Sequence, residues 1–362
     1  VYSLAPDRGH AHFLPELEAL GVTIHRLDDL NDKVLAQPSL SIREQSMIDA
    51  LPRNLRNQVR LLLPLVKQLK PDVLHGWQDA SAAACSIVGA AASVNRIVLS
   101  FRNMSPATRR DKVLAQNETL FKEMVARENV MVSANSRIAA DDYAGWLGCK
   151  NQRIDVIPNA IDISRYPAAP KLPDTPKGSG KLRIGGIFRL AVNKRPLLWL
   201  QTIHALRHEQ NIDLKPLLFG TGPLTSEVED EAETLGLSDL VLRSDVVDPV
   251  ALYGKIDVLL LMSQVEGLPN VLIEAQAMGK PVAACDVGGV REAVKRSGRG
   301  AGLLLGPDVT ASDAAAQLAR WLPDARTTPP QIFQKFATDN FTSDLLASRT
   351  LQTYRGHRVR PS

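Results

Sequence analysis

Short apolar runs alternate with helical stretches along most of this 362-residue chain. In the first half, the apolar runs lie at residues 71–77, 96–101, 129–134 and 153–158. A second set begins at residue 182, with a helical stretch and further apolar runs after it. Alternation of this kind is typical of parallel sheets whose strands are joined by helices on both faces. The sequence therefore predicts an α/β fold built from two Rossmann-like, doubly wound units.

Residues 168–181 separate the two sets of apolar runs. They are rich in Pro, Lys, Gly and Ser and show no hydrophobic periodicity, which is typical of a linker. We therefore expect a first domain over residues 1–168, a linker over residues 169–181 and a second domain over residues 182–340. Residues 341–362 include an amphipathic helical stretch. In doubly wound sheets ligands bind beyond the carboxyl ends of the strands, so a site is expected in a central cleft between the domains.

The composition is that of a globular protein, with 44% hydrophobic and 23% charged residues. No apolar run approaches the ~18–20 residues that span a bilayer, and we expect no signal peptide. Cys85, Cys149 and Cys285 are far apart and odd in number, which indicates thiols in a reducing compartment. A cytoplasmic protein is therefore expected. Neither the cysteines nor the histidines have the spacing of a metal site.

The strongest functional signal lies in residues 265–294, with the sequence VEGLPNVLIEAQAMGKPVAACDVGGVREAV. Glu266 and Glu274 stand on either side of seven residues, and the turn between them leads into a helical pattern that starts at Asn270. The first backbone N–H groups of such a helix have no partner within it, so they bind anions such as phosphate. Glu274, one turn into the helix, is placed to accept hydrogen bonds from ribose hydroxyls. A Gly-Gly turn follows, and the combination predicts a site for a sugar attached to a diphosphate.

This segment resembles the donor-site signature of retaining glycosyltransferases of the GT-B fold, in the family-four (group 1) set that includes enzymes of bacterial polysaccharide and glycolipid biosynthesis. Other stretches resemble landmarks of the same family in the same order, namely PNAID at 158–162, GIFRLAVNKRP at 186–196 and FGTGP at 219–223. The resemblance implies that residues 341–362 form a helix that crosses back to the first domain. It also implies that one strand–turn–helix unit of the first domain is missing at the start of the chain.

The resemblance assigns roles to the donor half of the site. Arg189 and Lys194 would clamp the donor diphosphate, Glu266 would orient the sugar hydroxyls, and Glu274 would hold the ribose. A larger set is expected to line the donor site, and it comprises Gly220, Arg243, Gly267, Leu268, Pro269, Asn270 and Val271. Taken alone, the carboxylates would be ordinary solvated charges and the glycines an ordinary turn. Their register with the rest of the signature favours the functional interpretation.

The acceptor half departs from the family pattern. Family members often carry a His after the strand that matches residues 96–101, whereas this chain has Arg102 followed by Asn103. A guanidinium can bind developing phosphate charge through two hydrogen bonds, but it does not donate its proton. We therefore expect Arg102 and Asn103 to act in catalysis, although the alternative that they only begin an ordinary loop stays open. His75, after another apolar run, is the second candidate.

The first domain also carries a basic stretch. Residues 50–115 hold ten basic and three acidic side chains, a net charge of +7. One face of a predicted helix there is apolar and comprises Leu55, Val59, Leu62, Leu63, Val66 and Leu69. Two interpretations stay open, a stripe that packs against the domain core or a basic amphipathic helix that lies on the inner face of an anionic membrane. No aromatic platform accompanies the charge, so nucleic acid is not an expected partner.

The implied reaction is the transfer of a sugar from a nucleoside diphosphate sugar, UDP rather than GDP, to a glycan or lipid-linked acceptor with retention at the anomeric carbon. No Asp-x-Asp motif for a metal is visible, so the resemblance implies a metal-independent hexosyltransferase without a cofactor. Two alternatives on the same architecture stay open. One is another enzyme, a nucleotide-sugar epimerase or a glycan phosphorylase, although a phosphorylase would need a much longer chain. The other is a non-catalytic nucleotide-sugar-binding protein.

Overall fold

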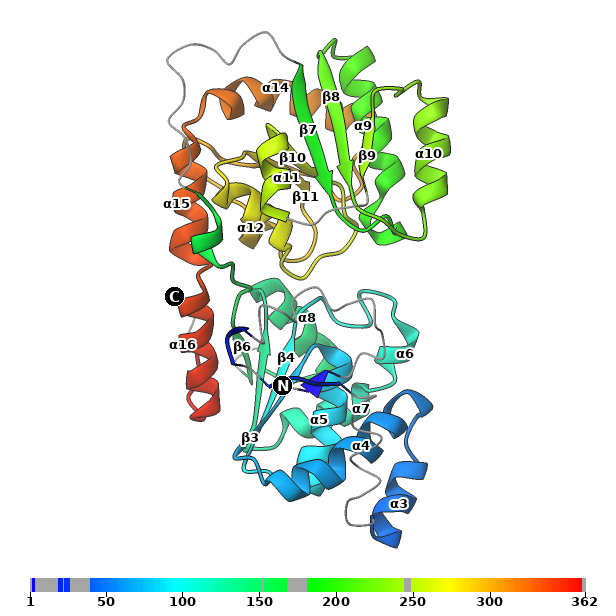
Figure 1. The fold of residues 1–362 in the computed structure, drawn as a ribbon, viewed down its shortest axis with the longest axis vertical. Helices are drawn as coiled ribbons and strands as arrows, with labels where there is room; N and C mark the ends of the chain where they lie inside the picture. Colours follow the sequence, from blue (N-terminus) through cyan, green and yellow to red (C-terminus); the bar gives the residue numbers. More distant parts are fainter. Residues whose placement is uncertain are drawn as a thin grey trace.

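The structure, a computed structural model, describes residues 2–3, 19–21, 23–26, 40–150, 153–167, 181–243 and 249–359. The linker expected at 169–181 lies outside the described residues except for Lys181. Two larger parallel sheets, each covered by helices, form the two halves of the molecule (Figure 1). The predicted α/β fold with two Rossmann-like units is confirmed.

A four-stranded parallel sheet in the order β3-β4-β5-β6 forms the centre of the first domain. Its strands are Val73–Trp77 (β3), Arg96–Phe101 (β4), Val130–Ala134 (β5) and Ile154–Val156 (β6). The helices of this half are Ile42–Asp49 (α3), Arg53–Leu69 (α4), Asp79–Ala91 (α5), Lys112–Ala115 (α6), Glu118–Val125 (α7) and Arg137–Leu147 (α8). Two further short strands, Tyr2–Ser3 (β1) and His25–Arg26 (β2), pair in parallel with each other. Strand β5 is buried along its whole length, as expected where helices cover both faces of a sheet.

A six-stranded parallel sheet in the order β12-β11-β10-β7-β8-β9 forms the centre of the second domain. Its strands are Leu182–Ile187 (β7), Leu214–Phe219 (β8), Val241–Arg243 (β9), Val258–Leu261 (β10), Val282–Cys285 (β11) and Leu303–Leu305 (β12). The helices are Pro196–His208 (α9), Thr225–Thr234 (α10), Pro249–Lys255 (α11), Asn270–Ala277 (α12), Val290–Ala293 (α13), Ala311–Thr327 (α14) and Pro330–Asn340 (α15). The strand order reverses between β7 and β10. Doubly wound sheets bind ligands at the loops that follow the two strands of such a reversal.

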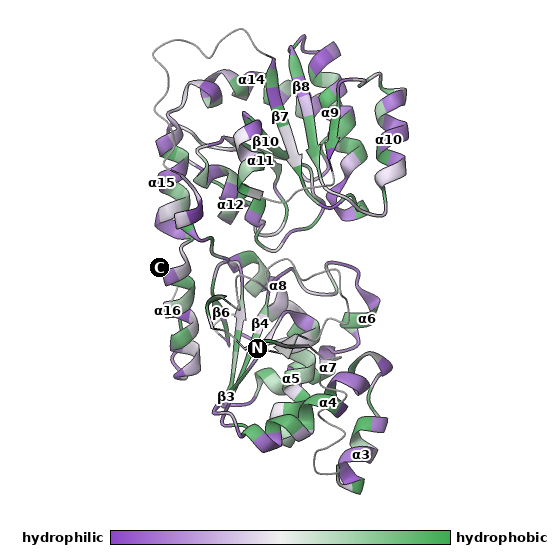
Figure 2. Ribbon diagram, in the orientation of Figure 1, coloured by the Kyte–Doolittle hydropathy of each residue, from purple (hydrophilic) through white to green (hydrophobic). Residues whose placement is uncertain are grey.

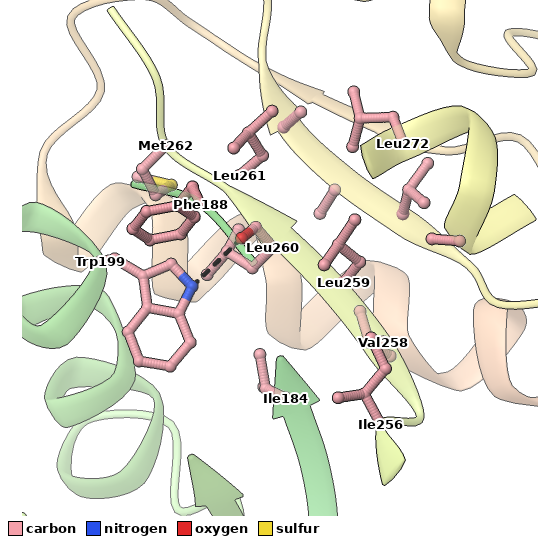
Figure 3. Packing of buried hydrophobic residues seen from close by; sticks show 14 of the residues in the cluster. Ile184, Phe188, Trp199, Ile256, Val258, Leu259, Leu260, Leu261, Met262 and Leu272 are labelled. Atoms are coloured by element: carbon pink, nitrogen blue, oxygen red, sulfur yellow. Dashed lines mark hydrogen bonds between the residues drawn. The ribbon is translucent and has the colours of Figure 1, made fainter. Parts of the chain in front are cut away.

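Apolar side chains on the faces of this sheet form the core of the second domain. Trp199 of α9 is fully buried, and its indole N–H donates a hydrogen bond of 3.1 Å to the carbonyl oxygen of Leu260 in β10 (Figure 3). Figure 2 shows the same division between inside and outside, with hydrophobic residues along β8 and hydrophilic residues over α10. This packing fixes the strand ends from which the site loops begin.

The last helix, Ser343–Tyr354 (α16), lies along the first domain (Figure 1). The two chain segments that cross between the domains run side by side, because Ile161 and Thr342 form a parallel β-bridge. Beyond α16, the Arg358 guanidinium donates a hydrogen bond of 2.6 Å to the carbonyl oxygen of Arg153. The chain that leaves the second domain therefore packs on the first domain both before and after α16.

The predicted amphipathic helix is α4, and its apolar face packs into the first domain. Leu55, Val59 and Leu63 are buried there. On the outer side, Arg60 pairs with Asp49 of α3 at 3.0 Å. The apolar face is not available to a bilayer, so the structure favours the core-facing interpretation over insertion of this face into a membrane.

Candidate active site

The loops at the carboxyl ends of the two sheets meet between the domains at Gly267. A Cβ atom at Gly267 would lie 2.6 Å from Cα of Asn103 and 2.9 Å from Nδ2 of Asn135. Gly267 belongs to the turn between β10 and α12, whereas Asn103 and Asn135 follow β4 and β5. Only a residue without a side chain fits this approach. The predicted donor turn therefore lies against the strand ends of the first domain, and Asn103 is part of that contact.

Lys194 and Glu266, both predicted to act on the donor, form an ion pair. Lys194 ends the short 3-10 helix Val192–Lys194 after β7, and Glu266 lies in the turn after β10. Their side chains are 23% and 10% exposed, so water screens this pair less than a pair on the open surface. Arg189, at the end of β7, is exposed, and no described residue pairs with its guanidinium. A shielded ammonium, a carboxylate and a free guanidinium are suited to a diphosphate that carries a sugar.

Arg195, which the sequence analysis did not single out, ties the loop after β7 to the end of β10. Its Nε donates a hydrogen bond of 2.6 Å to the carbonyl oxygen of Met262, and its Nη2 donates one of 2.9 Å to that of Ser263. Each of the two loops carries one member of the ion pair, so Arg195 fixes Lys194 relative to Glu266. Its only signal in the sequence is its place directly after Lys194.

Asn159 of the first domain binds the start of α12. Its Nδ2 donates hydrogen bonds of 2.8 Å to the carbonyl oxygen of Leu268 and 2.7 Å to Oδ1 of Asn270. Pro269, the residue before the helix, supplies no side-chain cap. The first N–H groups of α12 therefore remain without a capping side chain, as an anion site requires. Asn159 lies in the PNAID landmark, but nothing in the sequence predicted this contact.

The carboxylate of Glu274 already has a partner within the protein. The Tyr253 hydroxyl, from α11, donates a hydrogen bond to it. Burial raises the pKa of Glu274 above its usual value, and this hydrogen bond opposes the rise. The ribose contact of Glu274 stays a prediction, and a ribose would share the carboxylate with Tyr253.

The turn at Gly220 has a packing role. Its φ angle is 145°, and a Cβ atom there would collide with the carbonyl oxygen of Phe188. The N–H of Gly220 donates a hydrogen bond of 2.9 Å to the carbonyl oxygen of Arg243. The turn therefore supports the loop after β7 independently of any ligand contact. Arg243, the last residue of β9, is exposed, and residues 244–248 lie outside the described part of the chain.

Arg102 does not face the cleft as a free charge. Its Nη1 donates a hydrogen bond of 2.9 Å to the carbonyl oxygen of Ile157, and its Nη2 donates one to Oδ1 of Asn159. Its Cζ lies 4.3 Å from the ring centroid of Trp77. Burial lowers the pKa of Arg102 to about 10, so the group stays charged at neutral pH. Arg102 thus supports Asn159 and, through it, the start of α12, and its expected catalytic role stays a prediction.

His75 is also bonded within the protein. Its Nδ1 lies 2.8 Å from the hydroxyl of Tyr354 in α16, and its Nε2 lies 2.7 Å from the hydroxyl of Ser100 in β4. Both ring nitrogens are therefore used within the protein. His75 thus joins α16 to the first sheet, and its expected substrate contact stays a prediction.

The His75 contacts predict a pH dependence of stability. Burial, together with the positive charge of Arg102, lowers the pKa of His75 from 6.5 to about 4. The contribution of His75 to the free energy of unfolding is therefore fully present above pH 6.5. It is lost as the pH falls from 6.5 to 4, because in this range the unfolded chain binds the proton and the folded chain does not. The loss is at most about 3 kcal/mol. In urea unfolding, the advantage of the wild type over His75→Gln should shrink between about pH 7.5 and about pH 4.5. An advantage that is equal at both pH values would contradict the prediction.

Glu292, near the end of the signature, reaches across to the first domain. Its carboxylate accepts hydrogen bonds from the backbone N–H groups of Arg137 (2.7 Å) and Ile138 (2.9 Å), at the start of α8. The Ser136 hydroxyl caps the same helix by accepting a hydrogen bond of 3.1 Å from the N–H of Ala139. Hydrogen bonds and the helix dipole both stabilise a carboxylate in this position. Glu292 therefore links the second domain to the first.

Replacement of Glu292 by Ala should expose the N–H groups of Arg137 and Ile138. We expect their hydrogen exchange to accelerate about fivefold, which corresponds to ~1 kcal/mol for a lost cap. The N–H of Ala139 keeps its Ser136 partner and should not change. Exchange is measured by NMR, with Glu233→Ala, an exposed change on α10, as the control. Unchanged exchange at both positions would show that the contact does not form in solution.

The described part of the chain shows no gathering of three His, Cys, Asp or Glu side chains that could hold a metal ion. No described helix is long and apolar enough to cross a membrane. The loop after β7 carries three positive charges, those of Arg189, Lys194 and Arg195.

Several solved structures share this fold. The Anabaena protein Alr3699/HepE, solved in complex with UDP and glucose, superposes with a TM-score of 0.71 over 98% of both chains at 16% identity. The lipopolysaccharide outer core galactosyltransferase WaaB superposes with a TM-score of 0.67, also at 16% identity, over 96% of this chain and 87% of that chain. At these identities the likeness concerns the fold alone.

The chain is also similar in sequence to curated proteins. The Vi polysaccharide biosynthesis protein VipC/TviE of Salmonella typhi is 27% identical over 371 residues, which cover 98% of this chain and 63% of that protein. A D-inositol 3-phosphate glycosyltransferase of Nocardia farcinica is 31% identical over 192 residues, which cover 49% of this chain and 42% of that protein. The chain thus spans less than two thirds of the length of these relatives.

Two facing Rossmann-like domains are the architecture of the GT-B fold, which these solved structures share. The profile of Glycosyl transferases group 1 matches residues 181–324, and that of Glycosyltransferase Family 4 matches residues 11–165. The chain belongs to this group 1, family 4 set of glycosyltransferases.

Proposed function

We propose that this chain transfers a hexose-type sugar from a UDP-sugar to a glycan or lipid-linked acceptor, with retention at the anomeric carbon and without a metal ion. The observation that carries the proposal is the Lys194–Glu266 ion pair, which is shielded from water in the loops after β7 and β10. The UDP bound to HepE supports the choice of nucleotide. The polysaccharide role in the name of the Salmonella relative supports the choice of acceptor.

In the proposed reaction, the bond between the anomeric carbon and the diphosphate oxygen breaks, and negative charge develops on the diphosphate. Lys194, Arg189 and the uncapped start of α12 stabilise that charge. Once the diphosphate has replaced Glu266 as the partner of Lys194, the carboxylate is free to accept hydrogen bonds from the sugar hydroxyls. The acceptor hydroxyl bonds to the same carbon, and its proton passes to the departing diphosphate.

Thermal unfolding with UDP-, GDP- and ADP-sugars tests the donor half of this proposal. A ligand that binds only the folded state must raise the Tm, and we expect the rise with a UDP-sugar. Glu274→Ala should weaken UDP binding, whereas the exposed change Glu233→Ala should not. The proposal fails if none of the nucleotide sugars shifts the Tm of the wild type.

The rate of UDP release tests transfer itself. Release that rises only when a glycan or lipid-linked acceptor is added supports a transferase. Conversion of the donor sugar without any acceptor would instead indicate an epimerase, and binding without any turnover would indicate a binding protein.

A further inference from the structure

Trp77 ends β3 at the edge of the first sheet that faces the second domain, and 42% of its surface is exposed. Among the described residues, no other Trp, Tyr or Phe side chain is exposed. No described residue accepts a hydrogen bond from its indole N–H. An open aromatic surface with an available donor is what ligand sites use to combine apolar contact with orientation.

The Trp77 ring is fixed from one side. The guanidinium carbon of Arg102 lies 4.3 Å from the ring centroid, and Arg102 is itself bonded to the carbonyl oxygen of Ile157 at 2.9 Å. The ring of His75 lies edge-on to the indole, with centroids 5.4 Å apart and an angle of 63° between the planes. A ring that is already ordered loses little freedom when a ligand binds.

Trp77 is close to the donor turn. It pairs in register with Ser100 of β4, and Asn103, three residues beyond Ser100, is the residue that meets Gly267. Arg102 and Asn159 connect Trp77 to that turn. The Arg102 guanidinium lies 4.3 Å from the indole centroid and donates a hydrogen bond to Oδ1 of Asn159, whose Nδ2 donates one of 2.8 Å to the carbonyl oxygen of Leu268. A sugar ring on Trp77 would therefore lie beside a sugar held by the donor turn.

Gln78, the next residue, has an unusual backbone. Its φ of 72° and ψ of 163° fall in a region that residues other than Gly rarely adopt. Such conformations cluster at ligand sites, where the surrounding structure maintains them. The exposed Gln78 amide offers both hydrogen-bond donors and an acceptor, as sugar hydroxyls require.

We infer that Trp77 and Gln78 form a subsite for a hexopyranose ring of the acceptor. The C–H face of the sugar stacks on the indole face opposite Arg102, because ring faces carry negative charge density and C–H groups are weakly positive. The Gln78 amide and the indole N–H bond its hydroxyls. This inference rests on the proposed function and narrows it, because it requires an acceptor that presents a sugar ring.

Tryptophan fluorescence and calorimetry test the subsite. The probes are the methyl α-glycosides of glucose, galactose, N-acetylglucosamine and N-acetylgalactosamine, each added to protein saturated with UDP. At least one should protect the wild-type emission from quenching by acrylamide. Trp77→Ala should bind that glycoside about tenfold more weakly and Gln78→Ala about threefold more weakly, whereas Trp77→Phe should restore most of the affinity. Ile42→Ala, an exposed apolar change on α3, is the control, and all variants should bind UDP like the wild type.

The outcomes separate this inference from the proposed function. Equal affinity of Trp77→Ala and the wild type for the glycoside overturns the subsite, and so does a wild type that binds UDP but none of the four probes. A wild type that does not bind UDP overturns the proposed function instead.

Discussion

Replacement of Lys194 by Ala should slow the release of UDP from the donor about 10²- to 10³-fold. One pre-positioned donor at a site of developing negative charge contributes a factor of this size. Lys194 ends the short helix after β7, and Arg195 fixes that loop to the end of β10, so the ammonium is already placed before a donor arrives. The variant also leaves the shielded Glu266 carboxylate without its partner, so the affinity for UDP should fall as well. A phosphatase-coupled assay gives the rate, and calorimetry gives the affinity.

Lys335→Ala is the matched control for Lys194→Ala. Lys335 forms an exposed ion pair with Asp339 one turn along α15, at 3.0 Å. Such pairs contribute about 0–1 kcal/mol, so this variant should keep the activity and the Tm of the wild type. Lys194→Ala with a wild-type Tm and a rate within about threefold of the wild type would show that the ammonium does not act on the diphosphate.

The sequence predicted those parts of the fold and site that depend on neighbours along the chain. The helix start predicted at Asn270 is the first residue of α12. Lys194 and Glu266 were expected at one ligand, and they form an ion pair. The spacing of apolar residues and the positions of Gly and Pro determine where a strand, a turn or a helix begins. These features can therefore be predicted from the sequence.

Contacts between distant segments could not be predicted in this way. His75 and Tyr354 are 279 residues apart, and Glu292 is 155 residues from Arg137. Arg102 illustrates the consequence, since it has the charge that a phosphate site needs but lies against a tryptophan and the first-domain loops. No local pattern distinguishes a charge that faces a ligand from one that supports a neighbour. The packing of the two domains and of α16 decides which it is.

Replacement of Gly289 by Ala should impair the stability and the activity together, because Gly289 lies where both domains converge. A Cβ atom there would collide with the carbonyl oxygen of Gly267 in the donor turn and would lie 2.7 Å from both Cβ and Oγ of Ser136, the N-cap of α8. A backbone oxygen cannot rotate away as a side chain can, so either the donor turn or the first domain must move. Overpacking of this kind costs about 1–3 kcal/mol of stability. A shift of about 1 Å in a site can reduce the rate about 10²-fold.

Gly145→Ala on α8 is the same substitution as Gly289→Ala, but it is expected to raise the stability where Gly289→Ala lowers it. No atom lies within 4 Å of a Cβ built there, and Ala in a helix is more stable than Gly by about 0.5–1 kcal/mol. For Gly145→Ala, the free energy of unfolding in urea and the rate of UDP release should therefore equal or exceed the wild-type values. For Gly289→Ala, both should fall well below them. The clash can be relieved by movement of the donor turn or by displacement of the first domain. Small-angle scattering distinguishes the two, because only displacement of the first domain increases the radius of gyration. If Gly289→Ala matches the wild type in stability and in rate, the two domains do not meet at this turn in solution.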